Sequence, residues 1–120
     1  MGKKVKPGMT AKEIATLHYE LIMANDYDEW LKTFRVFHQE RAKSYGSSPD
    51  LYWRTGRRYI DELGYTYKFK NFVENQSSDK RKKFFFFRYN KDGDEQGQVP
   101  IHIVIDEDDK DEWRVDVASW

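Results

Sequence analysis

The chain contains no cysteine among its 120 residues, which excludes disulfide frameworks, thiolate metal sites and a cysteine nucleophile. It also lacks net charge, because 21 Lys and Arg side chains balance 21 Asp and Glu side chains. A general nucleic-acid binder needs a basic excess to neutralise phosphates, so this composition argues against that class of protein. The sequence also lacks any apolar stretch of the length that a membrane-crossing helix needs.

The first nine residues are basic and carry no apolar stretch, so they do not form a signal peptide. With Pro7 and Gly8 they predict a disordered lead-in over residues 1–9, followed by a single domain over residues 10–120. We expect a cytoplasmic protein. An extracytoplasmic location stays open if a signal segment has been removed.

Three helices are predicted in the first half of the chain. A capping-box spacing that begins at Thr10 predicts a helix over 11–24. A second helix, over 26–41, follows an Asn-Asp break and carries an apolar stripe at helical spacing. The Ser-Pro pair that begins at Ser48 is typical of a helix start and predicts a third helix over 49–63.

After the third helix the apolar residues alternate with polar ones, which is the period of a strand. The pair Asp92-Gly93 predicts a two-residue hairpin turn between two of these segments. The four predicted strands are 65–75, 81–89, 98–106 and 112–119. Helices followed by an antiparallel meander make an α+β fold, with three N-terminal helices packed on one face of a four-stranded sheet.

Four consecutive phenylalanines, Phe84 to Phe87, lie in the second predicted strand. Because alternate side chains of a strand point to opposite faces, these rings must lie on both faces of the sheet. The helices of a small domain cover one face, and a partner subunit is the simplest cover for the other. We therefore predict a homodimer through the open sheet face. The alternative is a face that is partly wet, since single exposed rings are common.

The strand pairing decides which side chains share a face. A hairpin centred on Asp92-Gly93, followed by a turn in the acidic run, sets Ile101 opposite Val117. The predicted core face collects Phe84, Phe86, Val99, Ile101, Ile103, Ile105, Trp113, Val115 and Val117. The predicted outer face collects Phe85, Phe87, Tyr89, His102, Val104, Arg114, Asp116, Ala118 and Trp120, of which all but Asp116 and Ala118 are assigned to the dimer interface.

The order of elements, the break over 24–30 and the Trp-containing last strand over 111–116 resemble the nuclear transport factor 2-like superfamily, which includes ketosteroid isomerase-like and SnoaL-like proteins. The resemblance implies a cone-shaped (cystatin-like) α+β fold with a strongly curved sheet, and a frequent dimer through the open sheet face. It also implies a pocket between helices and sheet in those members that are enzymes. Here that pocket would be lined by His18, Tyr19, Tyr59 and Tyr67.

Catalytic candidates are few. His102 and Asp116 fall opposite each other on the predicted register, and a carboxylate that orients an imidazole can build a general base. A structural cross-strand pair is the favoured interpretation. An isomerase-type site needs an isolated acid in an apolar pocket, and the core-facing strand positions carry none. Three scattered histidines indicate no metal site, and no cofactor is expected.

The basic run Lys80–Lys83 precedes the Phe-rich segment, as in strands that stack RNA bases on aromatic rings. Charges that flank a sticky strand also suppress aggregation, and this second interpretation is favoured. The sequence therefore predicts a non-enzymatic protein-association or small-ligand-binding domain. A small apolar ligand is one partner considered, and neither nucleic acid nor membrane is expected as a partner. The alternative is a small SnoaL- or isomerase-type enzyme that uses the pocket between helices and sheet.

Overall fold

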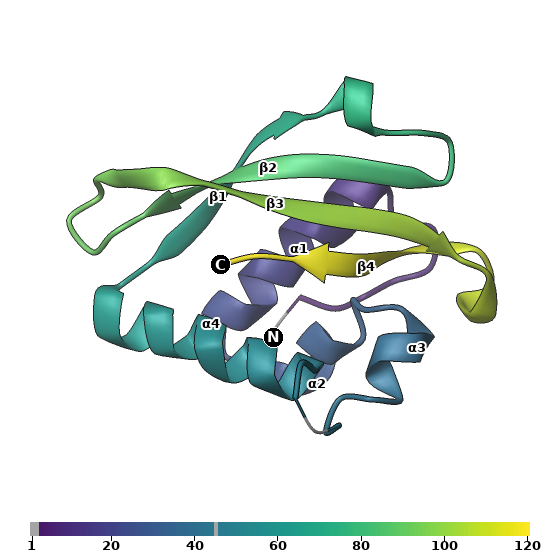
Figure 1. The fold of residues 1–120 in the computed structure, drawn as a ribbon, viewed down its shortest axis with the longest axis horizontal. Helices are drawn as coiled ribbons and strands as arrows, with labels where there is room; N and C mark the ends of the chain where they lie inside the picture. The colour runs from purple at the N-terminus through teal and green to yellow at the C-terminus, as the bar shows by residue number, and fades with distance from the viewer. Residues whose placement is uncertain (1–2, 45) are drawn as a thin grey trace.

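The computed structural model describes residues 3–44 and 46–120 and shows helices on one side of a four-stranded antiparallel sheet (Figure 1). The strands are hydrogen-bonded in the order β1-β2-β3-β4, and the sheet does not close on itself. This confirms the predicted α+β class. The elements are α1 Ala11–Met23, α2 Tyr27–Leu31, α3 Val36–Gln39, α4 Pro49–Leu63, β1 Thr66–Phe72, η1 Glu74–Gln76, β2 Arg81–Tyr89, β3 Glu95–Asp106, η2 Glu107–Asp109 and β4 Glu112–Ala118.

The two long helices begin and end where local chemistry dictates. The Thr10 hydroxyl accepts from the Glu13 amide and the Glu13 carboxylate accepts from the Thr10 amide, so α1 has the predicted capping box. Ser48 caps α4, and Gly64 ends it with a left-handed φ of 66°. Met1 and Gly2 of the expected lead-in, and Tyr45 of the loop before α4, lie outside the described residues.

The prediction of one continuous second helix over 26–41 is wrong. The chain forms α2 and α3 instead, and the segment 33–35 between them runs beside β4. The Val115 amide donates to the Thr33 carbonyl at 2.7 Å, and the Arg35 amide donates to the Val115 carbonyl at 3.1 Å. An edge strand leaves backbone groups unpaired, and this segment supplies partners for β4.

The register of β2 with β3 is the predicted one at Phe84, which pairs with Ile101. The register of β3 with β4 is also as predicted between Ile105 and Trp113, but it shifts between His102 and Ile103. Ile101 therefore pairs with Ala118 rather than with Val117. As a result Val117 is 52% exposed instead of lying in the core. A bulge of this kind places one extra residue in a strand, and alternation alone does not predict it.

The β2–β3 turn is longer than the predicted two-residue turn. Residues 90–94 connect the strands, and the side chain of Asn90 accepts hydrogen bonds from the amides of Asp92 and Asp94. Gly93 has the expected positive φ, at 82°. A side chain that mimics a backbone turn is typical of Asn and stabilises this wider loop.

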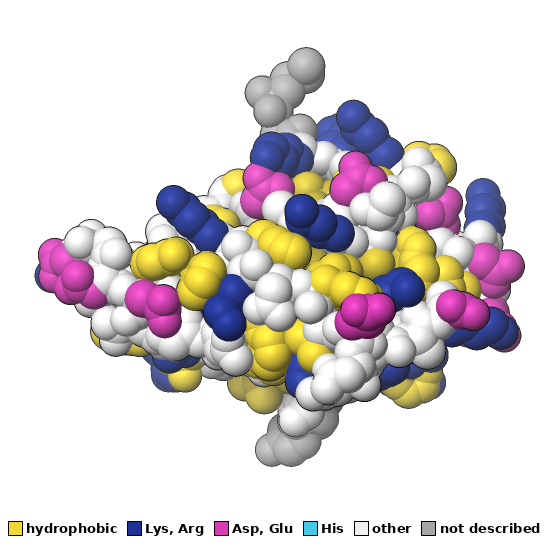
Figure 2. Space-filling model, turned by 90° about the horizontal axis from the view of Figure 1, so that it is seen from above, with side chains coloured by type: hydrophobic (Ala, Val, Ile, Leu, Met, Phe, Trp, Pro, Cys, Tyr) yellow, Lys and Arg dark blue, Asp and Glu magenta, His cyan; other side chains and the backbone are white. Residues whose placement is uncertain are grey.

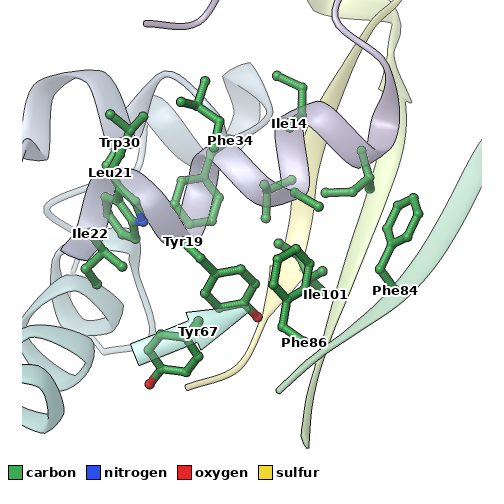
Figure 3. Packing of buried hydrophobic residues seen from close by; sticks show 14 of the residues in the cluster. Ile14, Tyr19, Leu21, Ile22, Trp30, Phe34, Tyr67, Phe84, Phe86 and Ile101 are labelled. Carbon is green, nitrogen blue, oxygen red and sulfur yellow. The ribbon is translucent and has the colours of Figure 1, made fainter. Parts of the chain in front are cut away.

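Helix α1 packs its apolar stripe on the inner face of the sheet, and this contact forms the core (Figure 3). Ile14, Leu21 and Ile22 are at most 1% exposed. Figure 3 shows Tyr19 reaching from α1 toward Phe86 of β2 and Tyr67 of β1. The centroid of the Tyr19 ring is 4.5 Å from that of the Phe86 ring and 5.0 Å from that of the Tyr67 ring. Each fully buried ring or aliphatic side chain stabilises the fold by about 1.5–3 kcal/mol.

Candidate functional site on the outer face of the sheet

Strand β2 divides its rings between the two faces of the sheet. Phe84 and Phe86 point inward and are 5% and 1% exposed. Phe85, Phe87 and Tyr89 point outward and are only partly buried. No helix of the described chain packs over these three rings, because α1 and α4 lie on the other side. Figure 2 shows the molecule from above, where hydrophobic side chains reach the surface across the middle with both basic and acidic side chains between them.

Lysine side chains from β1 and β2 lie over these outward rings. The Lys70 ammonium is 5.8 Å from the centre of the Phe85 ring and 5.6 Å from that of Phe87. The Lys83 ammonium is 4.9 Å from the centre of the Phe85 ring, and that of Lys68 is 5.8 Å from the Tyr89 ring. These are cation–π contacts at an accessible surface, each of which stabilises by about 0.5–1 kcal/mol.

Toward β4 the outer face holds a cluster of charges around Asp116. Arg35 Nη1 donates to Oδ1 at 3.1 Å and Arg81 Nη1 donates to Oδ2 at 2.9 Å. His38 Nε2 lies 3.3 Å from Oδ1. The hydrogen bonds from His38, Arg81 and Arg35 hold the pKa of the Asp116 carboxyl well below its usual range, although burial acts in the opposite direction. Asp116 is therefore an anion shared by neighbouring cations.

The structure corrects the predicted pairing of His102 with Asp116. The bulge in β4 sets Val117 opposite His102, and the hydrogen-bonded imidazole at Asp116 belongs to His38 of α3. Burial, and then the positive charges of Arg81 and Lys83, lower the pKa of His102. Its Nδ1 is buried and has no hydrogen-bond partner among the described residues. A base held by a carboxylate is therefore absent at His102 in the described part of the chain.

Three of the four residues expected to line a pocket, His18, Tyr19 and Tyr67, are buried in the core. His18 is completely buried, and its Nδ1 lies 2.8 Å from the Thr33 hydroxyl. That hydroxyl donates to the Trp30 carbonyl, so it accepts from His18 Nδ1–H, and the ring is the neutral Nδ1–H tautomer. Burial lowers the pKa of His18 to about 3. The imidazole is a neutral core group at neutral pH.

The space around His18 is filled by aromatic rings. The Trp120 ring stacks on that of His18 with a 2° interplanar angle and 5.5 Å between centroids. Tyr19 and Tyr67 are 0% and 4% exposed and contact each other. Tyr59 lies apart from these residues, on α4, with its ring 5.8 Å from that of Tyr65. The structure brings His18, Tyr19 and Tyr67 together as packing partners.

A groove of about 650 Å³ opens elsewhere, between the lead-in and α1. It is lined by Lys3, Lys4, Lys6, Pro7, Gly8, Met9, Lys12, Glu13, Thr16, Leu17 and Glu20. Its walls are therefore exposed lysines, two glutamates and short apolar stretches. None of the four predicted pocket residues contributes to these walls.

Two residues assigned to the outer face have other roles. Trp120 turns inward, and its indole N–H donates to the Tyr52 carbonyl at 2.8 Å. Arg114 is 6% exposed and its Nε donates to Asp109 at 2.8 Å, which fixes the turn before β4. Val104 is partly buried on the outer side of β3, where it pairs with Arg81 and Arg114. The outer face therefore loses two of its predicted anchors.

The sequence interpretation missed the lysines of this face and two side chains from the α3 region, Arg35 and His38. Lys68 and Lys70 alternate with Tyr67 and Phe69 in the sequence, and this alternation already indicates that the two lysines share one face of the strand. The approach of Arg35 and His38 to Asp116 had no such signal, because it depends on the contact between segment 33–35 and β4.

The described residues hold no group of three or more His, Cys, Asp or Glu side chains arranged to hold a metal ion. Among them, no helix is both long enough and apolar enough to span a membrane. No protein-family model matches the chain, and no curated protein matches its sequence.

Proposed function

We propose that the chain is a non-enzymatic association domain that binds its partner through the outer face of its sheet. The observation that carries this proposal is the division of rings in β2. Phe84 and Phe86 complete a filled core, whereas Phe85, Phe87 and Tyr89 remain partly exposed on a face that no described helix covers. Aromatic side chains that remain accessible on an uncovered face are typical of interaction surfaces.

We propose a second copy of the chain as the occupant of this face, in the manner of the nuclear transport factor 2-like dimers that the sequence resembles. A two-fold contact presents the same patch from both copies, so Phe85 and Phe87 would meet apolar groups of the partner sheet. Val117 and Val104 extend the apolar surface toward β4. The same symmetry sets lysines against lysines, so we expect the dimer to strengthen as salt screens their repulsion.

The enzyme alternative has less support. It needs a cavity with converging polar groups, and the residues proposed to line one are in contact with other core rings. Burial keeps His18 neutral but leaves it no access to a substrate. A small apolar ligand between helices and sheet would have to displace the same rings. We therefore place the association function first.

Light scattering coupled to size-exclusion chromatography tests the proposal at about 50 mM and about 500 mM salt. We expect a dimer whose share grows with protein concentration and with salt, and a monomer for the variant Phe85→Ser/Phe87→Ser. Phe37→Ser is the matched control, because Phe37 is 46% exposed and lies on α3 rather than in the row of rings on β2. A chain that stays monomeric in both salts up to the solubility limit contradicts the proposal, as does equal dissociation by the control.

A further inference from the structure

The β1–β2 half of the outer face carries a row of aromatic rings lined by cations. Alternate residues of a strand point to the same face, so Phe85, Phe87 and Tyr89 follow one another along the outer side of β2, and the ring centroids of Phe87 and Tyr89 are 5.9 Å apart. The cations on the same face are Lys68, Lys70, Arg81 and Lys83.

Negative charge on this face is limited. Glu95 pairs with Tyr89 at the hairpin end of β2. Asp116 already accepts hydrogen bonds from Arg35 and Arg81. Among the described residues, neither Lys68 nor Lys70 forms an ion pair. The face is therefore locally basic although the whole chain has no net charge.

We propose that this half of the outer face binds single-stranded nucleic acid. The lysines would hold the phosphates and the rings of β2 would stack the bases, which is how sequence-tolerant single-strand binding works. The 5.9 Å between the Phe87 and Tyr89 ring centroids exceeds the rise of about 3.4 Å between stacked bases of a strand, so these rings suit bases that are separated from one another.

The present positions of the lysines agree with this role. Their ammonium groups lie over the rings, with that of Lys83 4.9 Å from the centre of Phe85. Lys68 and Lys70 are exposed, and their flexible four-carbon side chains can move the ammonium group from the ring to a phosphate. An acidic polypeptide would satisfy the same cations, but its carboxylates have no aromatic face to stack on the rings. The combination of rings and lysines therefore favours a nucleic acid over an acidic protein.

This inference does not require self-association, although it uses the same face as the proposed function. A second copy and a nucleic acid cannot occupy that face together. The two occupants respond oppositely to salt, because screening weakens attraction to phosphates and relieves repulsion between lysines. Replacing Lys68 and Lys70 by Gln should likewise weaken binding of the nucleic acid and strengthen the dimer.

Fluorescence anisotropy with a labelled oligothymidylate of about fifteen nucleotides tests the inference on the full chain. We expect measurable binding at about 50 mM salt, with a Kd that rises about 20-fold at about 200 mM for three phosphate contacts. Lys68→Gln/Lys70→Gln is expected to weaken binding about 10-fold. The matched control Lys4→Gln/Lys6→Gln removes the same charge from two exposed lysines of the lead-in and should change Kd less than about 2-fold.

Base stacking is tested separately with Phe87→Leu, which keeps an apolar side chain. We expect this variant to bind the oligothymidylate about 5-fold more weakly and to bind an abasic strand of equal length as the parent chain does. Circular dichroism confirms that each variant is folded.

Four results would overturn the inference. The first is that the folded protein does not bind the oligothymidylate at low salt, and the second is that the parent chain binds the abasic strand or a duplex as tightly as the oligothymidylate. The third is that polyglutamate competes as well as unlabelled oligothymidylate. The fourth is that Lys4→Gln/Lys6→Gln weakens binding as much as Lys68→Gln/Lys70→Gln does. The last two would indicate a generic polyanion surface. A chain that binds the oligonucleotide but never dimerises contradicts only self-association, whereas a dimer without oligonucleotide binding contradicts only this inference.

Discussion

At the scale of single residues, His18 shows how its surroundings determine the role of an ionisable side chain. Its ring is enclosed by Trp30, Phe34 and Trp120, and its one hydrogen bond goes to Thr33. The sequence places this histidine within an apolar helical stripe, which is compatible with a core residue or with a pocket. Only the packing of Trp120 on its ring decides for the core, because that contact joins residues about a hundred positions apart.

Burial of neutral His18 makes the fold sensitive to acid. Its pKa is about 3 in the folded chain against 6.5 ordinarily, so the unfolded chain binds the proton more tightly. This contribution to the free energy of unfolding is complete above about pH 6.5 and is lost as pH falls toward 3. Between about pH 8 and pH 5 we expect a loss of about 2 kcal/mol from this group.

Urea unfolding of the parent chain and of His18→Phe, followed across the same pH range, measures this loss. The variant has no titrating ring at the site and should lose about 2 kcal/mol less between pH 8 and pH 5. The other histidines remain in both chains, so their contributions cancel in the comparison. Parallel pH profiles for the two chains would show that His18 is not a neutral buried group.

At the scale of elements, the helix boundaries set by residues close in sequence were predicted correctly. The features that depend on contacts between distant residues were not. The capping box of α1 and the Ser48 and Gly64 caps of α4 involve residues close in sequence, and both helices form as predicted. The break between α2 and α3 depends on the pairing of Phe34 with Val115, which no local pattern encodes. The bulge at β4 likewise moved Val117 out of the core and separated His102 from Asp116.

The segment between α2 and α3 provides a test of how much this edge contact stabilises the fold. The Arg35 amide donates to Val115, and the φ of Arg35, −54°, suits proline. Arg35→Pro removes the amide and the side chain, whereas Arg35→Ala removes only the side chain and its bond to Asp116. We expect the proline variant to be less stable than the alanine variant by about 1 kcal/mol in urea unfolding. Equal stabilities would mean that this hydrogen bond adds nothing.

At the scale of the whole molecule, the net charge and the spatial distribution of charged residues lead to different expectations about a nucleic-acid partner. Equal numbers of acidic and basic residues argued against a nucleic-acid partner, yet β1 and β2 gather lysines on one face of the sheet. Acidic residues gather instead at the turns, as in η2 and the β2–β3 loop. Net charge is a sum over the whole surface, whereas a partner contacts one face. The sequence shows Lys68 and Lys70 on one side of β1, and the fold adds Lys83 of β2 beside them.

Helix α4 packs closely against α1 and against Trp120 at the position of Gly56. A methyl group at Gly56 would lie 2.5 Å from Ile22 Cδ1 and 2.8 Å from the Trp120 ring. Helix propensity predicts that Gly56→Ala stabilises α4 by about 1 kcal/mol. Overpacking of this kind destabilises by about 1–3 kcal/mol, so we expect a net loss of stability in urea unfolding.

The sign of that change distinguishes packing from propensity. In a Trp120→Leu background the ring contact is gone and the Ile22 methyl can turn aside, so Gly56→Ala should become neutral or stabilising there. A stabilised Gly56→Ala variant in the parent chain would show that the Trp120 indole does not fill the space between α4 and α1. The space around His18 would then be open, and a ligand pocket between helices and sheet would again be compatible with the structure.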